Sequence, residues 1–142
     1  MSPEENKDLV RRLFDAVNHR SLDELDTLLS PDFLLNGEPV SPDDFKAFVD
    51  WHVSVLTEVR FAIEDLIAEG DKVVARLQRQ GTHQGWLDVE PTGMPTTTRG
   101  IYIFRVADGK LAEAWDAWDE LGLLEQIGAV WKVEREGEAG TA

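Results

Sequence analysis

The chain has 142 residues, of which 42% are hydrophobic, and it contains no cysteine, which excludes disulfides and thiol catalysis. Its net charge of −14 at pH 7 argues against nucleic acids and anionic membrane surfaces as partners, because their phosphates would be repelled. The longest apolar runs fall far short of the roughly 20 residues that a membrane-spanning helix requires. We expect a cytoplasmic globular protein, with one domain in residues 1–130 and a polar, flexible tail in residues 131–142.

Two helices in the first half begin with the same signal. Ser2-Pro3-Glu4-Glu5 and Ser41-Pro42-Asp43-Asp44 each provide an N-cap serine, a proline at the first helical position and an acid three residues after the cap. The first predicted helix ends near Asn18. The apolar face of the other extends to Leu56, and His52 lies on that same face.

A short helix is predicted between these two. The spacing Ser21-x-x-Glu24 is that of a capping box, and leucines follow it at helical spacing. Pro31-Asp32 is expected to end this helix, and Phe33-Leu34-Leu35 forms a short strand that leads into an Asn36-Gly37 turn.

From Val59 onward the hydrophobic pattern changes to that of strands. Strands are predicted over residues 59–68 and from residue 72 to about 82, followed by a loop over 83–95 and a hairpin within 100–118. Asp119 then caps a short terminal helix. Strands grouped after helices indicate an α+β domain, in which helices cover one face of a curved sheet and leave a cone whose open end can bind a ligand.

The hairpin carries Asp116 between Trp115 and Trp118. An ionised carboxylate in apolar surroundings is costly unless it is paired or protonated, so its orientation matters. A two-residue Asp108-Gly109 loop would place Asp116 on one face with Ile101, Ile103 and Arg105.

A three-residue loop would instead pair Val106 with Lys110, with Gly109 in the left-handed region. Asp116 would then share its face with Tyr102, Phe104, Ala112, Ala114 and Trp118, opposite Gly100 and diagonal to Tyr102. Leu111 would lie on the other face with Ile101, Ile103 and Trp115. We favour this reading because it keeps Arg105 and Glu113 together, away from the small residues.

Several stretches resemble the SnoaL-like polyketide cyclase group of the nuclear transport factor 2-like superfamily. They are Leu9–Asn18, Leu28–Phe33, Gly81–Gly85, Pro91–Gly93, Asp108–Leu111 and Trp115–Asp119. The resemblance covers almost the whole chain to about Gly128. It implies a cystatin-like, cone-shaped barrel, in which a curved mixed or antiparallel sheet wraps around N-terminal helices, as in the related ketosteroid isomerases.

The resemblance also implies a reaction. Members of the group carry out an aldol-type cyclisation of a polyketide ester by acid/base chemistry, with no metal or organic cofactor, using an aspartate on the last strand. Asp116 falls on that position. Tyr102 stands where the characterised cyclases carry a histidine, and Gly100 stands at another polar position.

Each candidate residue has a functional and a structural interpretation. Asp116 is a general base or acid, or else an outward-facing surface acid. Tyr102 donates to an enolate oxygen, or else only lines the pocket. His52 either lines the pocket or is a core histidine, and Asn36 either binds a ligand carbonyl or belongs to a plain turn.

The remaining candidates are aromatic residues and histidines. Trp86, Phe104 and Trp118 either form the pocket walls or belong to the core. His83 is expected to be solvated at the start of a loop. The three histidines are too far apart in sequence to form a recognisable metal motif, although the fold could still bring them together.

The sequence therefore predicts a cofactor-free acid/base enzyme that acts on a hydrophobic, carbonyl-bearing small molecule. Cyclisation, isomerisation and dehydration all remain open, because each begins with removal of the same kind of proton. The alternative is a non-catalytic binding or dimerisation module of the same fold. We also expect a homodimer, because Ile101, Ile103 and Trp115 would form an uncovered apolar patch on the convex sheet face.

Overall fold

The computed structural model describes residues 1–129, so the tail predicted for residues 131–142 lies outside the described part of the chain. The helices are α1 (Pro3–His19), α2 (Leu25–Leu28), α3 (Pro42–Val55) and α4 (Glu120–Gln126), with short 3₁₀ turns η1 (Leu22–Glu24) and η2 (Trp86–Asp88). The strands are β1 (Leu29–Leu35), β2 (Glu38–Pro39), β3 (Leu56–Glu69), β4 (Lys72–His83), β5 (Pro95–Ala107) and β6 (Lys110–Trp118).

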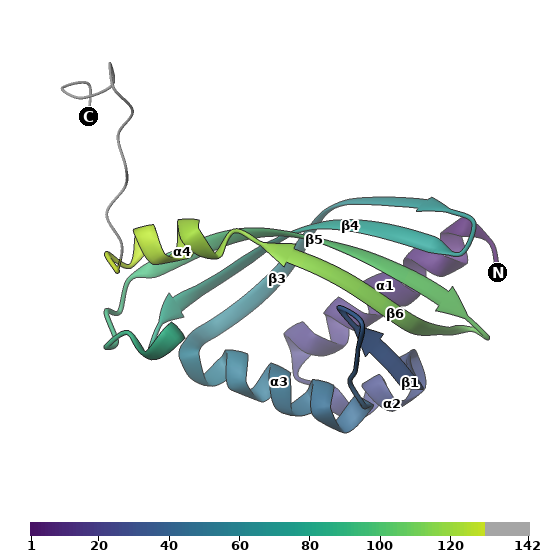
Figure 1. Ribbon diagram of the computed structural model, residues 1–142, viewed down its shortest axis with the longest axis horizontal. Helices are drawn as coiled ribbons and strands as arrows, with labels where there is room; N and C mark the ends of the chain where they lie inside the picture. Colours follow the sequence, from purple (N-terminus) through teal and green to yellow (C-terminus); the bar gives the residue numbers. More distant parts are fainter. Residues whose placement is uncertain (130–142) are drawn as a thin grey trace, which may run out of the picture.

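All six strands form one mixed sheet in the order β2-β1-β6-β5-β4-β3. Strand β1 runs parallel to β6, and every other neighbouring pair is antiparallel. The long strands curve over α1 and α3, which lie on the same side of the sheet (Figure 1). The buried side chains of the core lie between these helices and the sheet, so the predicted α+β cone is confirmed.

Both long helices begin as their sequences predict. In α1 the Ser2 hydroxyl accepts a hydrogen bond from the Glu5 backbone N–H at 3.1 Å, and the Glu5 carboxylate accepts one from the Ser2 N–H at 3.1 Å. Ser41 and Asp44 form the same reciprocal pair at α3. These boxes satisfy backbone donors that a helix start leaves free, and so fix where each helix begins.

The segment between them differs from the prediction. The Ser21 side chain makes no capping hydrogen bond, and the helical turn α2 ends at Leu28, before Pro31. The reason is tertiary: Leu29 already belongs to β1, where it pairs with Leu111 of β6. Likewise Leu56, predicted to lie on the α3 face, is the first residue of β3.

The turn of the last hairpin is also different. Ala107 pairs with Lys110, so the loop has two residues and the favoured three-residue loop is wrong. Asp108 and Gly109 have φ values of +52° and +75°, the combination that a type I′ turn requires.

A register shift then follows within the same hairpin. Val106 pairs with Leu111, but Arg105 pairs with Glu113, so Ala112 is an extra residue in β6. Such a bulge reverses which face the following residues occupy. Tyr102 therefore lies directly opposite Asp116 rather than diagonal to it.

The bulge has further consequences for the two faces. Gly100 lies opposite Trp118 rather than Asp116. Leu111, predicted on the outer face, is fully buried, because it lies before the bulge. The outer face otherwise matches the prediction: Ile101, Ile103 and Trp115 are between 43% and 50% exposed.

Within residues 1–129, no helix combines the length and the apolar character that crossing a membrane would demand.

Candidate active site

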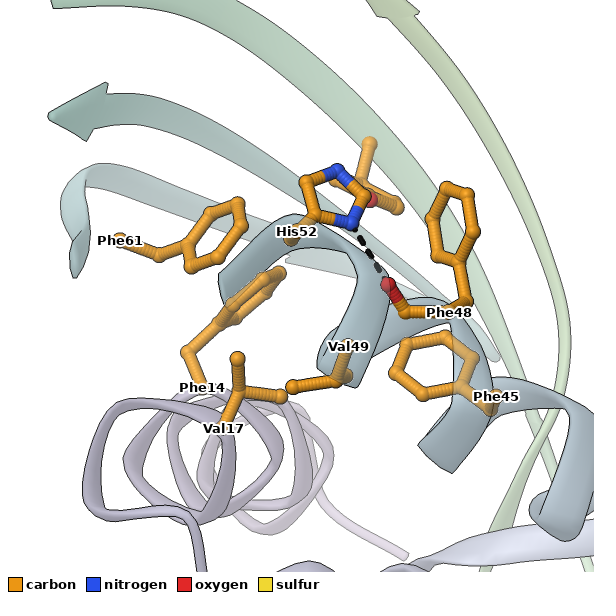
Figure 2. Close-up of a pocket in the computed structure, with 8 residues that line it drawn as sticks. Phe14, Val17, Phe45, Phe48, Val49, His52 and Phe61 are labelled. Atoms are coloured by element: carbon orange, nitrogen blue, oxygen red, sulfur yellow. Dashed lines mark hydrogen bonds between the residues drawn. The ribbon is translucent and has the colours of Figure 1, made fainter. Parts of the chain in front are cut away.

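A small apolar cavity of about 20 Å³ lies between α1, α3 and the sheet (Figure 2). Its lining residues are Phe14, Val17, Phe45, Phe48, Val49, His52, Phe61 and Tyr102. This volume has room for about one water molecule or one small polar group. Of the predicted site residues, His52 and Tyr102 belong to this lining, whereas the six other lining residues were not predicted as site residues.

His52 presents a defined ring nitrogen at this cavity. Its Nδ1 lies 2.9 Å from the backbone carbonyl oxygen of Phe48, as Figure 2 shows. Since a carbonyl oxygen only accepts, Nδ1 carries the hydrogen and the neutral ring has its lone pair on Nε2. Burial, reinforced by the positive charge of Arg79, lowers the pKa of His52 to about 4, so the ring is neutral at pH 7.

Tyr102 connects the cavity to Asp116. It lies on β5 directly opposite Asp116 of β6, and its side chain is 7% exposed. Burial and the nearby negative charge of Asp116 raise the pKa of the Tyr102 phenol. The hydroxyl therefore keeps its proton and can act as a hydrogen-bond donor at neutral pH.

Asp116 is half-buried and is held by two side chains. The Asn36 amide donates to Asp116 Oδ1 at 2.7 Å, and the indole N–H of Trp118 donates to Oδ2 at 3.1 Å. The Asn36 carbonyl oxygen in turn accepts from the backbone N–H of Asp116 at 2.9 Å. Each carboxylate oxygen thus accepts from a neutral donor, which fixes the direction of the carboxylate.

The backbone explains why Asn36 can make both bonds. It follows β1, adopts a left-handed φ of +53°, and donates its backbone N–H to the carbonyl oxygen of Ala114 at 2.9 Å. Asparagine tolerates this conformation better than most residues. The parallel pairing of β1 with β6 therefore brings residue 36 beside residue 116, a contact between segments far apart in sequence.

The sequence analysis missed a buried cation beside the Trp118 indole that binds Asp116. Arg79 on β4 is 1% exposed and lies between two indoles, with its guanidinium carbon 4.4 Å from the Trp86 ring centroid and 4.5 Å from that of Trp118. Its Nη2 donates to Glu120 Oε1 at 3.1 Å. The available signal was its position, in phase with the buried Val73, Ala75 and Leu77 of the same strand.

The predicted aromatic walls do not line the cavity. Trp86 is buried beside His52, with ring centroids 5.4 Å apart. Phe104 stacks on Tyr102 at 5.2 Å and lies in the core. Trp118 is half-buried between Tyr102 and Arg79.

His83 corrects another expectation. It was predicted to be solvated but is fully buried, because it forms hydrogen bonds with the loop that follows β4. Its Nδ1 accepts from the backbone N–H of Thr92 at 3.2 Å, and its backbone N–H donates to the Met94 carbonyl oxygen at 2.9 Å. Across residues 1–129, no three His, Cys, Asp or Glu side chains gather where they could hold a metal ion.

The geometry can be compared with known proteins. The model of the family described as SnoaL-like polyketide cyclase matches residues 7–127, most of the chain. The chain belongs to this family. The resemblance seen in the sequence is therefore confirmed, and Asp116 lies on the sheet of a SnoaL-like fold.

Two curated relatives of this SnoaL-like protein are cyclases. It is 32% identical over 136 residues to an aklanonic acid methyl ester cyclase of Streptomyces peucetius, covering 87% of this chain and 91% of the relative. It is 31% identical over 130 residues to the nogalonic acid methyl ester cyclase of Streptomyces nogalater, covering 84% and 94%. Family and relatives together make this chain a cyclase-type enzyme.

A solved structure agrees with the fold. The protein TsrD from Streptomyces laurentii has a TM-score of 0.83 and 28% sequence identity to this chain. The match covers 92% of this chain and 99% of TsrD, so the two share the whole cone.

Proposed function

We propose that this protein cyclises the methyl ester of a polyketide acid by acid/base chemistry that needs no cofactor. One observation carries the proposal: the oriented Asp116 carboxylate lies directly opposite Tyr102, and the buried side chain of Tyr102 lines an apolar cavity. A base and a neutral donor side by side are what the formation and stabilisation of an enolate require. The two curated cyclases named for methyl esters support this substrate class.

The reaction begins with proton removal. Asp116 takes the proton from a carbon next to a carbonyl group, and the electron pair left on that carbon delocalises onto the carbonyl oxygen. The Tyr102 hydroxyl donates a hydrogen bond to this enolate oxygen. The enolate carbon then attacks a second carbonyl of the same molecule, a carbon–carbon bond closes the ring, and the new alkoxide recovers a proton from Asp116.

The surrounding residues suit an apolar substrate. Neutral His52 offers Nε2 as an acceptor for a substrate hydroxyl. The cavity itself admits one small group, so the remainder of the substrate would lie against Phe48 and Trp51 of α3. These two side chains are both 42% exposed, their rings are 6.1 Å apart and nearly parallel, and both contact His52.

The test compares two variants that each remove one negative charge. Purified wild-type protein, Asp116→Asn and Asp108→Asn are incubated with aklanonic acid methyl ester, and chromatography with mass detection follows conversion to a product of unchanged mass. We expect Asp116→Asn to lose most turnover while keeping its fold, because the amide keeps the shape but cannot take the proton. Asp108 lies in the hairpin turn, where asparagine also tolerates positive φ, so this control should retain full activity.

Two outcomes would contradict the proposal. Equal turnover by wild type and Asp116→Asn would mean that another group removes the proton. Tight binding of the ester without conversion would instead favour the non-catalytic binding module.

We also infer that two copies pack through the outer face of the sheet. Ile101, Ile103 and Trp115 are about half exposed there, and the long helices α1 and α3 lie on the other side of the sheet (Figure 1). A two-fold axis lets the same patch serve both subunits, which buries apolar area on each side. Light scattering should give the mass of a dimer for wild type and of a monomer for Ile103→Glu, whereas a monomeric wild type at micromolar concentration would refute this arrangement.

A further inference from the structure

Arg79 is a buried charge that the reaction described above does not use. Its guanidinium carbon lies 4.5 Å from the ring centroid of Trp118, and the N–H of that same indole donates to Asp116 Oδ2 at 3.1 Å. We propose that Arg79 is a positioning residue, which holds the Trp118 indole so that its N–H stays directed at the Asp116 carboxylate. This inference rests on the proposed function only in assigning the base role to Asp116.

The indole of Trp118 is confined on two sides. Arg79 lies over its ring, and Gly100 lies opposite Trp118 in the β5–β6 ladder. A Cβ atom added at Gly100 would overlap Cδ2 and Cε3 of the six-membered ring of the indole. The ring therefore rests against bare backbone, and the guanidinium prevents it from turning away.

Contacts with two indole faces, more than hydrogen bonds, hold the guanidinium. In the part of the chain that the structure describes, Arg79 Nε is buried without a hydrogen-bond partner, and Glu120 contributes one carboxylate oxygen, not two. A carboxylate that orients arginine firmly normally binds it through both oxygens. Here the guanidinium carbon lies over the rings of both Trp86 and Trp118, and a flat guanidinium suits contact with two aromatic faces better than the ammonium of lysine does.

The positive charge of Arg79 also affects the strength of the Trp118 indole N–H as a donor. A cation over an aromatic face draws electron density from the ring, so the indole N–H becomes a stronger donor. That donor faces the base of the reaction, whose other oxygen is held by Asn36. Arg79 does not line the cavity and is 1% exposed, so its effect on Asp116 passes through Trp118 and needs no contact with substrate.

The first test reads the indole directly and needs no substrate. The protein is labelled with ¹⁵N in its tryptophan side chains, and the Trp118 signal is assigned by its loss in Trp118→Phe. In wild type the Trp118 Nε1–H resonance should lie downfield, as expected for a donor to a carboxylate. In Arg79→Met it should move toward the position of a free indole.

Two further variants keep this test decisive. Arg76→Met removes an outward-facing arginine of the same strand, which pairs with Glu64, and should leave the Trp118 signal in place. Arg79→Lys keeps the positive charge beside Glu120 in case Arg79→Met fails to fold. Because the ammonium of lysine suits contact with both rings less well, Arg79→Lys should also move the signal. An unchanged Trp118 resonance in folded Arg79→Lys or Arg79→Met would overturn the proposal.

The second test uses the cyclisation itself. With aklanonic acid methyl ester as the probe, Arg79→Lys should lower kcat about tenfold and leave KM within about twofold, because the substrate contacts are intact. A raised KM with unchanged kcat would mean that Arg79 binds the substrate, and would refute a positioning role. If wild type converts no ester, the proposed function fails, while the resonance experiment still decides what Arg79 does.

Discussion

Replacing His52 by glutamine should change how the stability of the protein depends on pH. His52 is 6% exposed, and burial lowers its pKa from 6.5 to about 4. The unfolded chain, in which the ring meets water, therefore binds a proton at a pH where the folded chain does not. Lowering the pH from 6.5 to 4 favours the unfolded state.

The size of the effect follows from the shift in pKa. A difference of this size corresponds to about 3 kcal/mol in the free energy of unfolding once the pH is below both values. At pH 5 most of the loss is already present, about 2 kcal/mol relative to pH 7. Glutamine does not titrate, so His52→Gln should lack this contribution while keeping those of the carboxylates.

Urea denaturation at pH 7 and pH 5, followed by tryptophan fluorescence, measures the difference. Protein concentration is held constant, because a dimer unfolds in a concentration-dependent way. His19 provides a matched control: its Nδ1 also bonds the carbonyl oxygen four residues earlier, at 2.8 Å from Asp15, but its ring is exposed. We expect His19→Gln to behave as wild type does.

The reasoning would be wrong if His52→Gln lost as much stability between pH 7 and pH 5 as the wild type. That result would mean that folded His52 accepts a proton easily, through water or through Asp116. His52 could then not serve as the neutral acceptor in the cavity.

Three further substitutions test the site. Gly100→Ala should lower the free energy of unfolding by about 1–3 kcal/mol in urea denaturation, because its methyl group overlaps the Trp118 ring. Trp51→Ala should raise KM for the probe ester several-fold with little effect on stability, because the side chain is 42% exposed. Asn36→Gly tolerates the positive φ but removes both side-chain hydrogen bonds to Asp116, so kcat should fall about tenfold or more while the thermal midpoint falls modestly.

The parts of the fold that follow local rules could be predicted from sequence. The starts of α1 and α3 depend on residues within one helical turn, and both capping boxes form. The predicted capping box at Ser21 has the same local pattern but forms no cap, because Leu29 pairs with Leu111 in the sheet. No signal near Ser21 reports a strand that begins about 90 residues further along the chain.

The candidate site divides in the same way. Asp116, Tyr102 and Asn36 could be nominated from the hairpin pattern, a turn signal and a family resemblance, and the structure brings these three together. Arg79 could not be assigned a role, because an arginine in a strand has meaning only once its neighbours are known. Those neighbours, Trp86 and Trp118, come from a loop and from another strand.

The last hairpin shows how two sound local arguments can conflict. Asp108-Gly109 is a strong signal for a two-residue turn, and that turn alone would put Ile101 on the same face as Asp116. The alternation of apolar and polar residues requires Tyr102 on that face instead. The two requirements differ by one residue in the pairing register, and a β-bulge accommodates one extra residue in a strand.

Ala112 is that residue, and the site depends on it. With the bulge, Tyr102 lies opposite Asp116, and Gly100 opposite Trp118 leaves room for an indole. Without the bulge, Asp116 would lie opposite Ile101, among the isoleucines of the outer face. Its carboxylate would then have no Tyr102 phenol opposite it, and the Trp118 indole would not lie in its present position. The conflict between the turn signal and the alternation was therefore itself a sequence signal for the bulge. The bulge places the base, Asp116, beside its donors Tyr102 and Trp118.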